Sequence, residues 1–298
     1  MKATTADVTK RRSLWMESWR RLKKNKLAMV GMTFILILVL ISIATVCIDL
    51  VTHRAFYNDH VIKQNLRLRL KGPNKEHIFG LDEFGRDIFL RILWGARYSL
   101  FMGLFAIAFA TVVGGILGAV AGYYGKNTDN IIMRLMDILL AIPSMLLATA
   151  IVAALGSSVF NLLLAIAISY IPTFARTVRA SVLTIKDQEF IEAARALGAS
   201  DRRIIFRYII PNCLAPLIVQ ATLGVAGAIL SIAGLSFLGL GIQPPTPEWG
   251  SMLSNARTYI REAWHITVIP GSAIMLTILA LNVMGDGLRD ALDPRLKN

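Results

Sequence analysis

The stretch Gln188–Asn212, QEFIEAARALGASDRRIIFRYIIPN, is a charged segment between two long uncharged stretches of the chain. The uncharged stretches are residues 138–175 and 213–247, and neither contains Asp, Glu, Lys or Arg. Residues 176–212 hold seven basic and four acidic side chains, and each charge costs about 2.5–3.5 kcal/mol near the centre of a bilayer. The segment is therefore expected outside the bilayer and tethered to it at both ends.

The same segment predicts two short helices joined by a turn. Apolar side chains recur at helical spacing in the first helix, and they are Phe190, Ile191, Ala194 and Leu197. Gly198 is expected to stop this helix with a positive φ, Ser200 to cap the second helix, and Pro211 to end it. The pattern indicates a helix-turn-helix with an alanine-rich face that a partner can approach closely.

Composition places the chain in the membrane. The 298 residues are 55% hydrophobic and 17% charged, with a mean hydropathy of +0.58, whereas soluble domains carry about 25% charged residues. The net charge of +13 is typical of a nucleic-acid-binding protein or of a membrane protein with basic cytoplasmic loops. A helix-turn-helix fixed to the membrane at both ends can hardly reach a DNA groove. Contact with membrane lipid is therefore expected, and nucleic acid is not an expected partner.

Uncharged stretches of about 20 residues predict the membrane-crossing helices. The stretches are 27–48, 98–124, 138–175, 213–247 and 266–285. The third is too long for one helix, so the turn at 156–158 divides it into spans near 131–155 and 158–176, and the fourth crosses at about 214–236. The first apolar run, taken to Leu50, is longer than a signal-peptide core and is expected to stay in the membrane. The total is six spans.

Basic residues decide the orientation of these spans. With the N-terminus in the cytoplasm, 21 Lys and Arg residues lie inside and 11 outside. Nine of the 11 lie in one long loop that also carries acidic residues. The predicted divisions are a basic cytoplasmic N-terminal helix (1–26), the first transmembrane helix (27–50), an extracytoplasmic loop (51–97), a five-helix core (98–288) containing the loop 177–212, and a cytoplasmic tail (289–298).

Four motifs carry a resemblance to a known family. The pattern of Glu192-Ala193-Ala194, Gly198 and Pro211 resembles the coupling loop of ABC importer permeases, although Tyr208 and Ile210 depart from the usual aliphatic residue and leucine. The segments 77–100, 243–250 and 284–295 resemble those of the dipeptide/oligopeptide/nickel permeases, with Leu81 and Leu90 replacing a usual threonine and serine. The similarity covers residues 15 to 296 and is greatest to the second permease subunit of such systems.

This resemblance implies an all-α integral membrane protein with six transmembrane helices. The implied fold is that of a type I ABC importer permease, with a cytoplasmic coupling helix between spans 4 and 5. The implied function is ATP-driven import of di- or oligopeptides into a prokaryotic cell, with the chain in the cell membrane and both termini cytoplasmic. The implied partners are a sister permease in a heterodimer, two cytoplasmic ATPase subunits and an extracytoplasmic binding protein.

The resemblance also assigns candidate functional residues. Contact with the ATPase is expected from Glu189, Glu192, Ala193, Ala194, Arg195, Leu197, Gly198 and Pro211. In the outer loop, Asp82, Gly85, Arg86 and Asp87 are candidates, and Arg86 and Asp87 are expected to contact the binding protein, gate the outer side or pair within the loop. No metal ligands and no catalytic residues are expected.

Two further expectations concern the membrane helices. Gly114, Gly118 and Gly122 recur four residues apart, which predicts close packing against another helix; a mobile helix lining the pathway is the alternative. Arg134 and Asp137 lie three residues apart and are expected to form an ion pair.

Rival classes of function lack their motifs in this sequence. There is no His-Glu-x-x-His or Gly-x-Ser-x-Gly motif for an intramembrane enzyme, and no ionisable residues deep in the spans for a proton- or sodium-coupled carrier. A channel would leave the charged loop unexplained. The chain has no phosphate-binding Gly-x-x-x-x-Gly-Lys-Ser/Thr loop, so ATP and magnesium are expected on partner subunits. The substrate stays open among dipeptides, oligopeptides, glutathione, nickel chelates and other small solutes.

Overall fold

The computed structural model describes residues 14–292, and these residues form a helical protein. The helices are α1 (Leu14–Lys24), α2 (Lys26–Val51), α3 (Ile88–Tyr124), α4 (Lys126–Ala141), α5 (Ser144–Leu155), α6 (Val159–Ile185), α7 (Glu189–Ala196), α8 (Asp201–Ile204), α9 (Ile210–Asn212), α10 (Leu214–Phe237), α11 (Trp249–Ala256) and α12 (His265–Leu292). Short π or 3-10 turns lie at Tyr57–Val61, Leu66–Leu68, Ile205–Ile209 and Arg257–Tyr259. Residues 1–13 of the predicted N-terminal helix and 293–298 of the predicted tail lie outside the described residues.

Five helices of the described chain are each long and apolar enough to cross a membrane, and they are α2, α3, α6, α10 and α12. A sixth span arises if α4 and α5 are counted together, since the pair passes the same test but bends by 89° at its break. The all-α fold is therefore confirmed, with five candidate spans, or the predicted six if the bent pair counts as one. The expectation that 131–155 forms one continuous helix is wrong.

Pro143 explains the break between α4 and α5. The residue before a proline is pushed out of the helical region, and proline has no N–H to donate to the preceding turn. Ile142 is accordingly extended, with φ −95° and ψ 126°. The turn between α5 and α6 lies where it was expected: Gly156 has a φ of 88°, and the Ser158 hydroxyl accepts a hydrogen bond from the Asn161 N–H at 3.1 Å.

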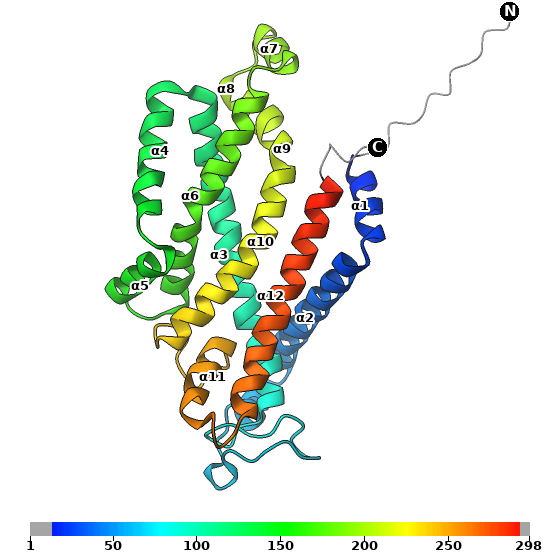
Figure 1. The fold of residues 1–298 in the computed structure, drawn as a ribbon, viewed down its shortest axis with the longest axis vertical. Helices are drawn as coiled ribbons and strands as arrows, with labels where there is room; N and C mark the ends of the chain where they lie inside the picture. The colour runs from blue at the N-terminus through cyan, green and yellow to red at the C-terminus, as the bar shows by residue number, and fades with distance from the viewer. Residues whose placement is uncertain (1–13, 293–298) are drawn as a thin grey trace, which may run out of the picture.

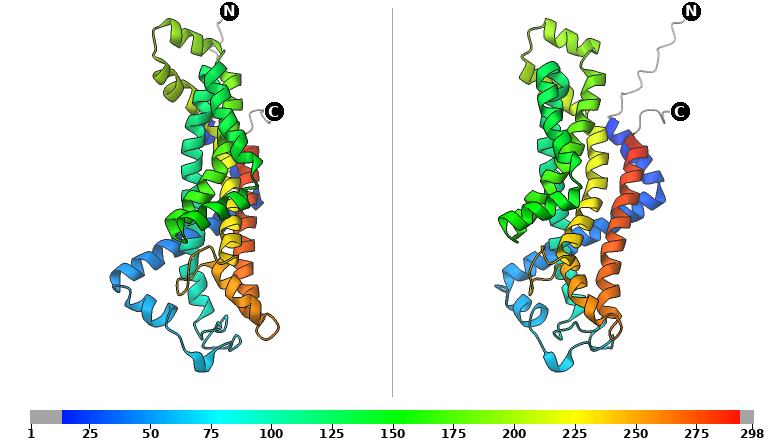
Figure 2. Two further views of the ribbon diagram at one scale, coloured as in Figure 1. Left: turned by 90° about the vertical axis from the view of Figure 1, so that its left-hand side faces the viewer. Right: turned by 60° about the vertical axis from the view of Figure 1, so that its left-hand side comes forward.

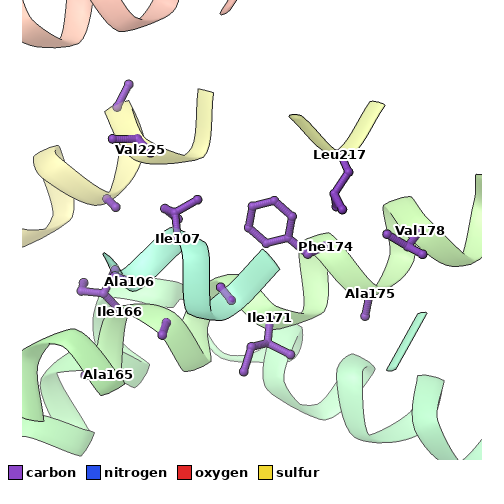
Figure 3. Close-up of a cluster of buried hydrophobic side chains, with 14 of the residues drawn as sticks. Ala106, Ile107, Ala165, Ile166, Ile171, Phe174, Ala175, Val178, Leu217 and Val225 are labelled. Atoms are coloured by element: carbon purple, nitrogen blue, oxygen red, sulfur yellow. The ribbon is translucent and has the colours of Figure 1, made fainter. Parts of the chain in front are cut away.

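The membrane helices pack around one main core. Figure 3 shows Ile107 of α3, Ile166 and Phe174 of α6 and Val225 of α10 in this core. On the other side of α10, α12 packs against α10 and α2. A second cluster of buried side chains, centred on Trp249 of α11, joins the start of α3 to the start of α12.

The three glycines of α3 lie against α6. A Cβ on Gly114 would lie 2.6 Å from the Ile171 carbonyl oxygen, and a Cβ on Gly122 would lie 2.8 Å from the Val182 Cβ. A Cβ on Gly118 would overlap the backbone of Ala175. The absence of side chains at these positions therefore allows α3 and α6 to approach closely.

The two ends of the molecule differ in what they carry. The hairpin of α7 and α8 projects from one end, and α1 and the last turns of α12 point toward that same end (Figures 1 and 2). The loop between α2 and α3 and helix α11 lie at the opposite end. The first and last described residues are therefore on the side of the α7–α8 hairpin.

Helix α3 begins ten residues earlier than the second predicted span. Its 37 residues measure about 55 Å at about 1.5 Å per residue, which exceeds the hydrocarbon layer of about 30 Å. The Asp87 carboxylate caps its start by accepting from the Leu90 N–H at 3.1 Å. Arg91 and Arg97 interrupt the uncharged run without ending the helix, because both side chains find carboxylate partners. The predicted boundary between loop and core at residue 98 thus falls inside a helix.

Candidate functional site

Helix α7 is a short amphipathic helix with one buried and one exposed face. Ile191 is fully buried and Ala194 is 6% exposed, and both lie on the face toward the rest of the protein. Glu192, Ala193 and Arg195 are exposed. Acidic residues in the first turn and Arg195 in the last match the helix dipole. The exposed face therefore combines charge with a small side chain.

Two members of the predicted apolar stripe are not buried. Phe190 is 40% exposed and Leu197 is 88% exposed, whereas Ile191 and Ala194 face inward. The predicted apolar stripe is therefore divided between two buried and two exposed side chains. Helix α7 has only eight residues, so its buried face is short, and the apolar residues near its two ends stay exposed.

Gly198 makes the turn between the two arms of the hairpin. Its φ is 77°, so the predicted positive φ is confirmed. Its N–H donates to the Arg195 carbonyl at 3.0 Å, and the Ala199 N–H donates to the Ala194 carbonyl at 3.0 Å. These bonds satisfy carbonyls that the end of α7 would otherwise leave open.

The second arm does not end at Pro211, contrary to the expectation from the sequence. Helix α8 continues through a π-helical turn over Ile205–Ile209 into α9, and Pro211 lies within α9. Because proline offers no N–H, a change of hydrogen-bond spacing beside it lets the chain stay helical. The Asn212 side-chain amide donates to the Tyr208 carbonyl at 2.6 Å. The hairpin is therefore joined to α10 by an almost continuous helical rod.

The outer face of this second arm is basic. A shallow hollow of about 400 Å³ is lined by Ser200, Arg202, Arg203 and Phe206. Arg202, Arg203 and Phe206 are exposed, while Ile204 and Ile205 on the other face are buried. The two arms together thus present acidic, small, apolar and basic side chains to their surroundings.

The candidate residues of the outer loop are mostly buried and paired with one another. Arg86 is 2% exposed and Asp82 is 4% exposed, and the Arg86 Nε donates to the Asp82 Oδ2 at 2.6 Å. Arg91 lies beside the same carboxylate at 3.3 Å and donates to the Pro245 carbonyl at 3.1 Å. Burial raises the pKa of the neighbouring Glu83 carboxyl. Of the roles expected for Arg86, pairing within the loop is the one formed in this structure.

Gly85 and Asp87 shape the same loop. Gly85 has a φ of 71°, and a Cβ there would overlap the backbone of Asn65. Asp87 caps α3 and its other oxygen lies 2.7 Å from the His77 Nδ1. Both residues therefore fix the outer loop on the start of α3.

The predicted ion pair between Arg134 and Asp137 is wrong. Asp137 instead binds Arg176 of α6 at 2.5 Å. Asp129, about two turns earlier in α4, binds Arg179 through both oxygens. Because α4 runs against α6, a long arginine side chain on the facing helix reaches these carboxylates.

Two buried carboxylates, Asp49 and Glu248, are not among the candidate site residues, although Glu248 lies in the motif 243–250. Asp49 of α2 accepts from the Trp94 Nε1 at 2.9 Å and the Arg97 Nη1 at 2.6 Å. Glu248 is 1% exposed and caps α11 by accepting from the N–H groups of Gly250 and Ser251, each at 2.8 Å. Asp49 had a detectable signal, since a lone charge in an apolar helix requires a partner. For Glu248 the sequence gives no comparable signal.

Metal and disulfide chemistry has no visible place in the described residues. Within residues 14–292, no group of three or more His, Cys, Asp or Glu residues could hold a metal ion. Cys47 is exposed and Cys213 is buried, and both are free thiols.

Two family models match the chain. The family described as binding-protein-dependent transport system inner membrane component matches residues 114–298. The model described as the N-terminal TM domain of oligopeptide transport permease C matches residues 13–73. The two matches together include the first membrane helix, the hairpin and all later helices.

Similar proteins cover nearly the whole chain. The dipeptide transport system permease protein DppC of Alkalihalophilus pseudofirmus is 52% identical, over 96% of this chain and 91% of that protein. The di/tripeptide transport system permease protein DppC of Pseudomonas aeruginosa is 45% identical over 95% of this chain and 92% of that protein. The glutathione transport system permease protein GsiD of Escherichia coli is 46% identical over 96% and 92%.

A solved structure has the same fold. The MetNI methionine ABC transporter in inward-facing conformations matches with a TM-score of 0.55, over 69% of this chain and 98% of that chain. The sequence identity is 18%, so this likeness concerns the fold alone. The residues outside the match amount to about a third of the chain.

Proposed function

Because the chain belongs to the family of binding-protein-dependent transport inner membrane components, we propose that it imports di- or oligopeptides as one permease subunit of an ATP-driven importer. The chain is a multi-pass membrane permease, and such permeases work with an ATPase and a solute-binding protein. The observation that carries the proposal is the α7–α8 hairpin, which projects beyond the membrane helices with an exposed, charged face.

We infer that the ATPase binds the hairpin and moves the membrane helices of the permease through it. Glu189, Glu192 and Arg195 supply charge on the exposed part of α7, and Ala193 leaves room for close approach. Leu197 has an apolar side chain that is 88% exposed, and a partner could bury this side chain in the interface. ATP and magnesium would bind to the ATPase subunits, since this chain has no phosphate-binding loop of the usual kind.

The rest of the hairpin is built to transmit motion. Ala194 and Ile191 seat α7 on the second arm, Gly198 sets the angle between the arms, and Pro211 lies in the rod that leads into α10. When ATP binding draws two ATPase subunits together, α7 moves with its ATPase, and α6 and α10 follow because they are the direct continuations of the two arms. Alternation between inward- and outward-facing forms would result.

We propose the orientation in which the hairpin and both termini are cytoplasmic, in the cell membrane of a prokaryote. The distribution of basic residues favours it, with 21 inside against 11 outside. The loop between α2 and α3 and helix α11 would then face the extracytoplasmic binding protein.

A sister permease is the proposed neighbour of α4 and α5. These two helices expose a row of large apolar residues, each more than half exposed, which are Ile131, Leu135, Ile138 and Leu146. Among the membrane helices of the described chain, α4 contacts α3 and α6 on one side, which leaves the other side free. A heterodimer with the substrate pathway at this face would cover it.

Two substrate classes have specific support. Relatives at 52% and 45% identity are named as dipeptide and di/tripeptide permeases, which favours short peptides. A relative at 46% identity is named as a glutathione permease, and glutathione is itself a small peptide. The binding protein of the same system decides between them: the ligand that raises its unfolding temperature identifies the cargo.

Copurification tests the proposed assembly. The tagged chain, extracted in a mild detergent from cells that express the whole transport system, should retain a sister permease and an ATPase. Uptake of a short peptide by the reconstituted complex should require ATP and the binding protein. Recovery of the chain alone, or uptake that continues without ATP, would contradict the proposal.

A further inference from the structure

Tyr123, in the last turn of α3, contacts both arms of the hairpin. Its hydroxyl donates to the Asp201 Oδ1 of α8 at 2.7 Å. The Arg195 guanidinium carbon of α7 lies 6.0 Å from the centre of its ring. One side chain of a membrane helix is therefore tied to the hairpin through two charged residues that lie 72 and 78 positions later in the sequence.

The helix that carries Tyr123 is held firmly at this end. A Cβ on the preceding Gly122 would lie 3.2 Å from the Arg179 carbonyl oxygen of α6 and 2.8 Å from the Val182 Cβ. Helix α3 therefore has little freedom to slide or turn against α6 near the hairpin. Gly125 ends the helix directly afterwards with a φ of 64°. The backbone of α3 at Tyr123 is therefore held in place against α6.

The other attachments of the hairpin restrain it differently. Its arms continue into α6 and α10, and its inner face is apolar, with Ile191 and Ile204 fully buried. Apolar contact has little directional preference, so it lets the hairpin tilt about its two chain connections. A hydrogen bond from a phenol to a carboxylate is directional and stronger than one between neutral groups. It can set the tilt where packing cannot.

We propose that Tyr123 is a positioning residue for energy coupling, which locks the tilt of the α7–α8 hairpin to α3 through Asp201 and Arg195. With the lock closed, a displacement of α7 moves α3 together with α6 and α10. With the lock open, part of the displacement is absorbed by tilting of the hairpin. This inference rests on the proposed function, because it assigns a route for the motion that the ATPase imposes.

The test compares Tyr123→Phe with Tyr124→Phe in the complete complex. Tyr124 is the adjacent residue, is 50% exposed and contacts the Tyr123 ring edge to face. Tyr124→Phe is therefore the matched control, because it also removes one hydroxyl group. The complex of both permeases, the ATPases and the binding protein is reconstituted in liposomes. Uptake of radiolabelled alanyl-alanine and hydrolysis of ATP are measured together, which gives the number of peptides imported per ATP.

We expect Tyr123→Phe to hydrolyse ATP at close to the normal rate and to import about three- to tenfold fewer peptides per ATP. This is the factor that corresponds to one hydrogen bond of ordinary strength, since the Tyr123–Asp201 bond is exposed to solvent. Tyr124→Phe should match the unmodified complex. Asp201→Ala should show the same defect as Tyr123→Phe, and the double variant should be no worse than either single variant, since both remove the one hydrogen bond between the two side chains.

Three results would contradict parts of this account and can be told apart. An equal number of peptides imported per ATP by Tyr123→Phe and Tyr124→Phe would contradict the proposed positioning role of Tyr123. A parallel loss of ATP hydrolysis, uptake and complex yield in Tyr123→Phe would also overturn it, because the residue would then serve only the stability of the fold. An unmodified complex in which neither peptide nor binding protein changes ATP hydrolysis would instead contradict the proposed function.

Discussion

At the scale of single residues, Gly198 carries the most direct conformational demand. Its φ of 77° lies in a region that β-branched residues enter only with strain. No atom would lie within 4 Å of an added Cβ, so a substitution here changes backbone preference without creating a clash.

We therefore expect Gly198→Val to strain the turn by about 1–2 kcal/mol and to uncouple transport while the chain still inserts into the membrane. Gly198→Asn is the matched control, because asparagine tolerates the left-handed region. Peptide uptake and the amount of chain in the membrane are the measurements. Normal uptake by the valine variant would show that the turn angle is unimportant.

Glu192 tests the charge of the exposed face of α7. It lies in the first turn of the helix, and we expect Glu192→Lys to weaken binding of the ATPase through charge reversal. Insertion should be normal, because the side chain is exposed. Copurification of the ATPase should fall at least about tenfold if a docked ion pair is broken, and Glu192→Gln should fall less. Full ATPase recovery with Glu192→Lys would place the docking surface elsewhere.

Glu248 gives a prediction about pH. Burial raises the pKa of this carboxyl above its usual value, so the folded protein binds a proton at a pH where the unfolded chain does not. The contribution of Glu248 to the free energy of unfolding is then smallest at high pH and grows as the pH falls through the folded pKa. As the pH falls from the alkaline side toward the usual carboxyl range, the unfolding temperature of the unmodified complex should rise relative to that of Glu248→Gln. A relative fall on acidification would refute the assignment.

The conformation of Gly198 could be predicted from the sequence, whereas the partners of Asp137 and Tyr123 could not. The φ of Gly198 follows from its place after a periodic helix, and this the sequence predicts. The partners of Asp137 and Tyr123 lie 39 and 78 positions away in the sequence. Local spacing therefore suggested Arg134 for Asp137 and suggested no partner for Tyr123. Such contacts depend on which helices are neighbours, which periodicity alone does not reveal.

At the scale of helices, the packing of α3 on α6 is the central element of the scaffold. Gly115 and Gly118 lie on the same helix but in different surroundings. A Cβ on Gly118 would overlap the Ala175 backbone, whereas a Cβ on Gly115 would meet the Leu217 Cδ2 at 3.9 Å.

We expect Gly118→Ala to destabilise the protein by about 1–3 kcal/mol, the usual cost of overpacking. Gly115→Ala should change stability by no more than about 0.5 kcal/mol, since its methyl group meets an ordinary contact distance. Thermal unfolding of the purified complex in detergent measures both. Equal stability of the two variants would mean that α3 and α6 separate more readily than their close contact indicates.

Hydropathy predicts where the helices are but not how long or straight they are. The uncharged-run criterion placed every span, yet it started α3 at residue 98 because Arg91 and Arg97 interrupt the run. It treated 131–155 as one helix because Pro143 is itself uncharged. Both errors come from using charge as the sole signal of a helix end, when capping by Asp87 and the geometry of proline set the actual ends.

At the scale of the whole molecule, the two ends are held together by different kinds of contact. The outer end is fixed by buried ion pairs of Asp82 with Arg86 and Arg91, and Arg91 also donates to the Pro245 carbonyl. The hairpin end is held by apolar seating and by the exposed Tyr123–Asp201 bond. The proposed coupling therefore depends on the Tyr123–Asp201 bond, because movement of the hairpin against the membrane helices would absorb part of the displacement that the ATPase imposes.

Coupling to a cytoplasmic ATPase requires the hairpin on the cytoplasmic side of the membrane, and cysteine accessibility measures that side directly. Glu192→Cys and, separately, Ile78→Cys are made with the exposed Cys47 changed to Ala and the buried Cys213 kept. Ile78 lies in the outer loop and is 61% exposed. A membrane-impermeant maleimide should label Ile78→Cys in intact spheroplasts and Glu192→Cys only after permeabilisation. Labelling of Glu192→Cys from outside, with Ile78→Cys protected, would contradict the account, since no cytoplasmic ATPase could then reach the hairpin.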